Sequence, residues 1–294
     1  MSDAPLLLLD AARIDAGGAV LLDGVSCGSS APELGLVGAW SPLFALLGGQ
    51  ATLASGRAEI GGAPARLAAS SGRVGLAPRS AARPPAWEVR RWLAYAARLA
   101  GVPARGARAE VSRALEELGL TALAARPCSS LTPFERRACS LAEAALGAPP
   151  VLAVEAPLAG LDEPAEQAML AVLERARARH RLIVSVETAP ATGAAKNLLD
   201  ALGEVIVLQA GRVVAEGSAE TALGRAPRYL VRVTRHAAAF AAALAERGFA
   251  PTRASPDGAR LVVEVGAAGD PSALVEVALE LGAPIVELAP LAPA

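Results

Sequence analysis

Short apolar runs alternate along this chain with longer segments in which apolar residues recur at helical spacing. The predicted strands are residues 34–38, 74–79, 151–154, 181–185 and 205–208. The predicted helices between them are residues 87–100, 107–118, 131–146 and 163–179. The run Val151–Val154 is continuously apolar, which is typical of a parallel strand that is covered on both faces. The pattern therefore predicts an α/β fold.

The two ends of the chain follow other patterns. Residues 6–9 and 20–26 are predicted to pair as an opening meander across a turn at residues 15–18. After residue 224 the predicted strands are 229–234, 251–254, 261–265 and 285–288, with helices at 236–247 and 273–281. That β-α-β-β-α-β order indicates a small ferredoxin-like domain. We therefore expect one large domain, residues 1–224, and an accessory domain, residues 225–294.

The segment from Arg126 to Asp162 carries the most specific signal. Ser129, Ser130 and Thr132 offer N-cap hydroxyl groups, and a proline such as Pro133 is tolerated in the first turn of a helix. The strand that follows this helix ends on a carboxylate, Glu155. Open α/β sheets bind their ligands at the carboxyl ends of the strands. The segment is thus predicted to end at a ligand-binding edge.

Three motifs in this segment resemble the ATP-binding domain of ABC transporters. They are Leu131-Thr132-Pro133-Phe134-Glu135, Glu155-Ala156-Pro157 and Gly160-Leu161-Asp162, in the places of the signature, the Walker B end and the D-loop. The string Asp162-Glu163-Pro164 copies the family's Asp-Glu-Pro, but no predicted strand leads into it. The resemblance implies a P-loop NTPase-like core, a helical subdomain at about residues 85–147, and ATP with Mg²⁺ as the family's ligand.

The phosphate loop of that family departs from its pattern here. The family reads G-x-x-x-x-G-K-[ST], and its backbone N–H groups and lysine hold the phosphates. In this chain Ser41 follows Gly38 after three residues instead of seven, and Lys196 is the only lysine. We expect a strand–helix turn without a ligand, although Gly38, Ser41 and Arg79 remain the candidate ATP contacts.

The remaining catalytic positions are also altered. By resemblance, Arg79 replaces the Q-loop glutamine, Glu155 the Walker B aspartate, Ala156 the general base and Glu187 the switch histidine. Alanine cannot accept a proton, so hydrolysis would lack its usual base. Glu155 could still contact a hydrated Mg²⁺.

The signature would also be altered in the half-site that this chain lends to a partner. Pro133 and Phe134 replace the two glycines of the family there, removing one N–H donor and adding bulk.

Composition bears on the kinds of partner and the compartment that we expect for this chain. The formal net charge is −1, which gives no electrostatic case for nucleic acid. The three cysteines have no metal-site or disulfide spacing and fit a reducing compartment. Residues 34–56 are uncharged and long enough to span a bilayer, but they contain Pro42 and several glycines, so we expect no membrane helix.

The sequence therefore predicts a degenerate, non-hydrolysing ATP-binding subunit, a pseudoenzyme with a structural or regulatory role in an export complex. The resemblance implies two partners, a transmembrane ABC permease subunit and a second ATP-binding subunit, at the cytoplasmic face of the membrane. The alternative is an active ATPase with a rebuilt site that uses Arg79, Glu155 and Glu187. Trp87 and Trp92 are either interface anchors or core residues of the helical subdomain.

Overall fold

The computed structural model describes residues 4–80, 86–188, 192–224, 228–253, 255, 258–265 and 272–291. The chain forms two compact units, residues 1–216 and 217–294, and each is described by itself. Pro256-Asp257-Gly258 is expected to be a turn between the predicted strands 251–254 and 261–265, but only Gly258 of it is described. Pro84 and Pro85 also lie outside the described residues.

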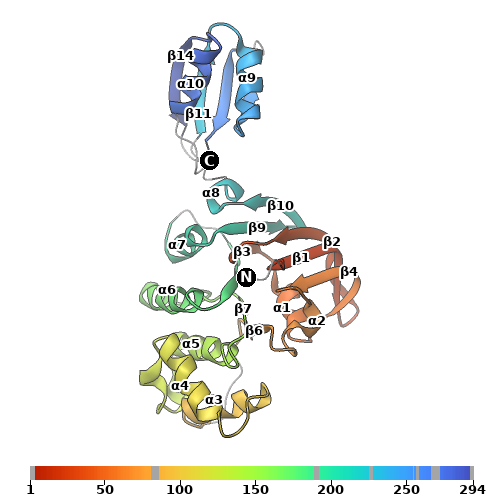
Figure 1. The fold of residues 1–294 in the computed structure, drawn as a ribbon, viewed down its shortest axis with the longest axis vertical. Helices are drawn as coiled ribbons and strands as arrows, with labels where there is room; N and C mark the ends of the chain where they lie inside the picture. Colours follow the sequence, from red (N-terminus) through yellow and green to blue (C-terminus); the bar gives the residue numbers. More distant parts are fainter. Residues whose placement is uncertain are drawn as a thin grey trace. The chain divides into compact units, whose positions relative to one another are not determined.

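A six-stranded sheet in the order β10-β9-β3-β8-β7-β6 forms the centre of the first unit (Figure 1). Its strands are β3 (Glu33–Gly38), β6 (Val74–Ala77), β7 (Val151–Val154), β8 (Arg181–Val186), β9 (Glu204–Gln209) and β10 (Arg212–Gly217). The strands from β9 to β6 pair in parallel. All four residues of β7 are buried, as its apolar run predicts. The predicted α/β class is confirmed.

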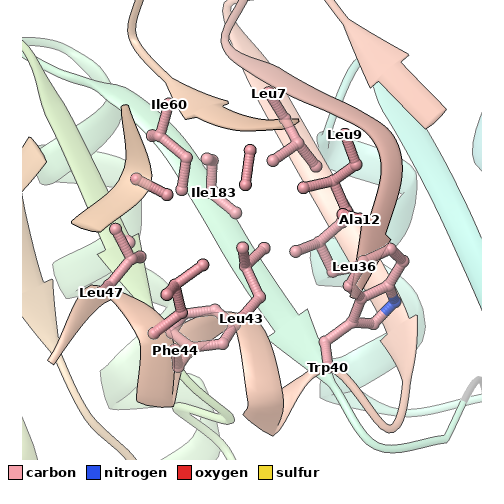
Figure 2. Packing of buried hydrophobic residues seen from close by; sticks show 14 of the residues in the cluster. Leu7, Leu9, Ala12, Leu36, Trp40, Leu43, Phe44, Leu47, Ile60 and Ile183 are labelled. Atoms are coloured by element: carbon pink, nitrogen blue, oxygen red, sulfur yellow. The ribbon is translucent and has the colours of Figure 1, made fainter. Parts of the chain in front are cut away.

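An antiparallel sheet lies beside this layer and consists of β1 (Leu7–Ala16), β2 (Ala19–Ser29), β4 (Thr52–Ile60) and β5 (Ala63–Pro64). The opening meander is confirmed, with strands longer than predicted. Helix α1 (Ser41–Leu47) and the short α2 (Ala65–Ala68) follow β3 and β5. Figure 2 shows Leu43 and Phe44 of α1 facing Ile183 of β8 and Leu7 of β1. These residues share one aliphatic core.

The helical part of this unit contains α3 (Val89–Leu99), α4 (Ala107–Glu117) and α5 (Pro133–Ala144). In the sequence, Val89, Trp92, Leu93, Ala96 and Leu99 recur at helical spacing, which predicts one apolar face. Val89, Leu93 and Ala96 are buried and Trp92 is half-buried, but Leu99 is 72% exposed, so the prediction is wrong for Leu99. Ala97 is buried instead, because the face of α3 that contacts α4 and α5 contains Val89, Leu93 and Ala97.

Helix α5 ends two residues before the predicted end at residue 146. The helix stops at Ala144, and Gly147 and Ala148 then take positive φ angles of 79° and 51°. The left-handed backbone therefore ends the helix before Pro149 is reached. Beyond β7 lie the helices α6 (Glu163–Arg177) and α7 (Ala194–Ala201).

The second unit has a four-stranded antiparallel sheet in the order β12-β13-β11-β14. Its elements are α8 (Ala219–Ala222), β11 (Arg228–Val233), α9 (Ala237–Glu246), β12 (Ala250–Arg253), β13 (Arg260–Glu264), α10 (Ser272–Glu280) and β14 (Ile285–Leu291). Val231 and Val263 pack with Phe240 of α9 and Val277 of α10 in a separate core. The predicted β-α-β-β-α-β order is confirmed.

The uncharged stretch 34–56 forms β3, α1 and the start of β4. Among the residues that the structure describes, no helix has both the length and the apolar character needed to cross a bilayer.

Candidate functional site

Four predicted site residues meet at the carboxyl edge of the six-stranded sheet. Gly38 ends β3, and Arg79, Glu155 and Glu187 follow β6, β7 and β8. The register pairs Val37 with Val186 and Ala77 with Val154. The carboxyl ends of these neighbouring parallel strands are therefore aligned along one edge of the sheet. This edge is where open α/β sheets bind their ligands.

Arg79 connects the two acidic residues of this edge. Its backbone N–H donates to Oε2 of Glu155 at 3.0 Å, and its guanidinium donates to the carboxylate of Glu187. The side chains of Arg79 and Glu187 are 47% and 53% exposed. An ion pair this exposed adds little to stability, about 0–1 kcal/mol. Its effect is to neutralise Arg79, the cation that the sequence indicates as a candidate phosphate contact.

Ala156 occupies a strained and closed position next to Glu155. Its φ angle is +44°, which is uncommon for a residue with a Cβ, and the residue is 5% exposed. Its backbone N–H donates to Oγ of Ser185 at 3.0 Å. The methyl group of Ala156 has no proton acceptor, so no general base stands at this position.

A cavity of about 240 Å³ opens beside these residues, and its lining includes Ala156, Glu187 and Glu166 of α6. Among the described residues that line it, the charged side chains are Glu166 and Glu187, both acidic. The carboxylate of Glu187 is paired with Arg79, and Glu166 adds a second carboxylate to the lining. The described lining thus offers a nucleotide triphosphate no cationic side chain.

The turn from β3 into α1 has its own structural reason. Gly38 has a φ angle of +105°, and a Cβ built there would lie 2.0 Å from the carbonyl oxygen of Leu208. Only glycine fits this close approach to β9. The N–H of Trp40 donates to the carbonyl of Gly38 at 2.9 Å, which closes the turn. Packing against β9 thus accounts for Gly38 without a ligand.

Trp40 fills the space beneath this turn. The residue is 1% exposed, and its indole Nε1–H donates to the carbonyl of Val37 at 3.1 Å. Figure 2 shows the Trp40 ring against Leu36 and Ala12, at one end of the core that α1 also lines. The turn is anchored to the core by this side chain.

The start of α1 offers few donors to a phosphate. Pro42 has no N–H, and the N–H of Leu43 donates to the carbonyl of Trp40 at 2.9 Å. Ser41 is exposed, and Lys196 pairs with Asp200 on its own helix, α7. The residues at this edge do not fit the triphosphate and Mg²⁺ that the resemblance implies. In the described part of the chain no three His, Cys, Asp or Glu side chains gather as a metal site.

The signature residues form a helix cap. Thr132 Oγ1 accepts the N–H of Glu135 at 3.2 Å, and Glu135 Oε2 accepts the N–H of Thr132 at 2.8 Å. Arg126 also pairs with Glu135. Burial raises the pKa of Glu135, but the hydrogen bonds from Thr132 and the charge of Arg126 outweigh it and lower the pKa overall. Leu131 is buried and Phe134 is half-buried. The residues of the motif therefore cap the helix and pack against their neighbours.

The predicted D-loop residue Asp162 caps α6 by accepting the N–H of Ala165 at 3.1 Å. No strand leads into it, as predicted, because β7 ends at Val154. Arg137 of α5 holds the segment before it by donating to the carbonyls of Pro157 and Ala159 at 3.0 and 2.8 Å. The sequence shows Arg137 only as one of two adjacent arginines, so its contact with this loop could not be predicted.

Solved structures decide the fold. CbiO1 of Clostridium perfringens, part of the CbiONQ ABC transporter complex, matches with a TM-score of 0.60 and 18% identity over 74% of this chain and 90% of that chain. A bacterial Atm1-family ABC exporter with ATP bound matches with a TM-score of 0.56 and 18% identity over 74% of this chain and 39% of that chain. The fold is that of an ABC transporter ATP-binding domain.

Curated relatives support the ABC transporter ATP-binding family. A Streptomyces coelicolor protein named as an ABC transporter ATP-binding protein is 33% identical over 165 residues, 55% of this chain and 29% of that protein. The zinc import ATP-binding protein ZnuC of Cereibacter sphaeroides is 38% identical over 82 residues, 28% of this chain and 34% of that protein. The match therefore spans about a third of the length of these relatives. No family model matches the chain.

Proposed function

We propose that this chain is a non-hydrolysing homologue of an ABC ATP-binding subunit, with a structural or regulatory role in a membrane export complex. In this proposal residues 1–224 are the ATP-binding-type domain, with a helical subdomain at about 85–147, and residues 225–294 are an accessory domain. The observation that carries the proposal is the closed turn from Gly38 to Trp40, which stands where the family's phosphate loop would be.

The energetics of that turn support the proposal. A hydrogen bond to a charged group is worth about 1.5–3 kcal/mol, and the turn lacks the lysine and most of the N–H donors of a phosphate loop. Each loss of about 1.4 kcal/mol weakens binding tenfold. Without those contacts, and with acidic Glu166 and Glu187 nearby, ATP affinity falls by several powers of ten.

The fold supports a place in a transporter, because the similar structures include a component of an ABC transporter complex and an ABC exporter. We propose a transmembrane permease subunit and a second ATP-binding subunit as partners, at the cytoplasmic face of the membrane. Co-purification from membranes with both kinds of subunit is the expected result. Recovery of the chain with neither would contradict the proposed role.

A second candidate is an ATPase with a rebuilt site. Arg79, Glu155 and Glu187 are connected at one sheet edge, so a cation and two carboxylates are close together. This candidate requires phosphate release above background that Glu155→Ala abolishes. Glu59→Ala is the matched control, because Glu59 pairs with Arg57 on the antiparallel sheet. Absence of phosphate release from the purified chain leaves the non-hydrolysing proposal.

A further inference from the structure

The second unit carries a row of charged residues across its sheet. Arg232 of β11 lies opposite Arg260 of β13 and opposite Glu287 of β14. The neighbours Val231 and Val233 are buried in the core with α9 and α10. Because side chains alternate along a strand, the three charged residues lie on the other face of the sheet.

The row has more positive charge than it can satisfy internally. Glu287 Oε2 lies 3.4 Å from Nε of Arg232 and 3.6 Å from an Nη of Arg260. Direct charge-assisted bonds are shorter, about 2.7–2.9 Å, and each guanidinium has five N–H donors. One carboxylate shared at these distances leaves the arginine pair with a net positive charge.

The opposition of Arg232 and Arg260 is itself unfavourable. Like charges directly opposite each other on antiparallel strands destabilise the sheet. Both side chains remain about half exposed, at 46% and 49%. An anion that bridged the two guanidinium groups would relieve this repulsion.

A cavity of about 400 Å³ adjoins the pair. Arg232 and Arg260 line it together with the hydroxyl-bearing residues Thr234 and Ser255. Val286 forms part of its wall at an irregularity in the β11–β14 register, where Arg232 pairs with Glu287 and Val233 with Ile285. Bulges of this kind redirect side chains and are frequent beside binding sites.

We propose that this cavity binds a small oxyanion, a phosphate or carboxylate group, between Arg232 and Arg260. The planar guanidinium fork matches both groups through paired hydrogen bonds. The volume suits a small molecule, and Thr234 adds a hydroxyl-bearing side chain to the lining beside the arginines. The site lies in the second unit and is independent of the function proposed for the first.

The test is calorimetric titration of the full chain with inorganic phosphate and, separately, with citrate. We expect saturable binding of at least one anion at a single site. Arg232→Gln and Arg260→Gln should each weaken it by about tenfold or more, since each removes a charged bidentate partner. Arg247→Gln is the matched control, because Arg247 is similarly exposed in the same unit but pairs with Glu280.

Glu287→Gln gives a result of opposite sign and keeps the test informative if an arginine variant fails to fold. Removing the competing carboxylate should tighten anion binding severalfold. Sedimentation with phosphatidylglycerol and phosphatidylcholine vesicles tests whether the anion that the site binds is a lipid phosphate or a free anion. Binding of either the lipid phosphate or the free anion supports the proposal if that binding depends on Arg232 and Arg260. No saturable binding of phosphate, citrate or anionic vesicles, or binding unchanged in both arginine variants, overturns the proposal.

Discussion

Arg79 and Glu187 form an ion pair between two loops that are 108 residues apart in the sequence. The pair joins the ends of β6 and β8 at the edge where open α/β sheets bind their ligands, and the N–H of Arg79 also donates to Glu155. Arg79, Glu155 and Glu187 thus form hydrogen bonds with one another at this edge.

Arg79→Gln introduces the glutamine that the family resemblance implies at this position, yet we expect it to restore no ATP binding. The turn from Gly38 to Trp40 would still lack the donors of a phosphate loop. Because the ion pair is half exposed, the free energy of unfolding should change by less than about 1 kcal/mol. Urea denaturation and Mg·ATP titration measure the two effects, with Arg57→Gln as the surface control. Tight ATP binding by Arg79→Gln would contradict this prediction and show that the turn from Gly38 to Trp40 can hold the phosphates.

Gly38→Ala should be among the most damaging single changes in the first unit. Its Cβ would lie 2.0 Å from the carbonyl oxygen of Leu208, at a φ angle of +105°. Gly49→Ala is the matched control, because Gly49 also has a positive φ, +71°, but nothing within 4 Å. We expect the control to lose about 1–2 kcal/mol from backbone strain alone.

The comparison of these two variants is made by chemical denaturation followed by tryptophan fluorescence. All three tryptophans, Trp40, Trp87 and Trp92, lie in the first unit, so the signal reports on that unit. Gly38→Ala should lose clearly more than the control or fail to fold. Equal losses would mean that β9 does not approach the turn as closely as described.

Trp40→Ala should lower the free energy of unfolding by about 3–5 kcal/mol, the usual cost of truncating a buried aromatic residue. It also leaves the carbonyl of Val37 without the indole N–H. Trp87→Ala should cost less, because Trp87 is half-buried and contacts exposed groups, the guanidinium of Arg91 and the ring of Tyr95. Urea denaturation of both variants measures the difference. A Trp87 variant as unstable as the Trp40 variant would contradict the anchoring role of Trp40.

Glu143 gives the chain a predictable pH dependence. Burial raises the pKa of its carboxyl group, and the hydrogen bond from Trp92 Nε1 at 3.2 Å offsets only part of this. A carboxyl group whose folded pKa is raised contributes stability below its unfolded pKa, about 4.3, and loses that contribution as pH rises through the folded pKa. Glu143→Gln should therefore stabilise the protein at pH 7 and have little effect below about pH 4.

Glu110→Gln is the control of opposite sign. The hydrogen bond from Arg113, more than any other interaction, lowers the pKa of Glu110, and burial opposes it in part. The stability from Glu110 is present above its unfolded pKa and lost as pH falls through the folded pKa. This variant should destabilise the protein at pH 7 and matter less in acid. Thermal melts across pH check both variants, and the same sign for the two at pH 7 would refute the assignment.

Local patterns predicted much of this fold. The continuous apolar run at Val151–Val154 can only be satisfied in a covered sheet, and β7 has these bounds. Thr132 was one of three hydroxyl residues predicted as N-caps, and the structure shows that it caps α5 in a capping box with Glu135. Both features depend on residues that are close together in the sequence.

The features that could not be predicted depend on distant residues. Gly38 is required by Leu208, which joins it only when β9 pairs with β3. Arg79 and Glu187 meet because their strands end at one edge, and neither residue has a neighbour in the sequence that predicts the pair. Leu99 has the periodicity of the buried stripe but lies at the last residue of α3, where the stripe leaves the core.

Equilibrium binding of Mg·ATP to the purified chain tests the central claim most directly. The closed turn at Gly38, the paired Arg79 and the acidic cavity beside Glu187 predict no saturable binding up to millimolar nucleotide. Saturable binding at micromolar concentration, lost when Ser41 or Arg79 is replaced by alanine, would contradict the account and show that this edge still holds phosphate.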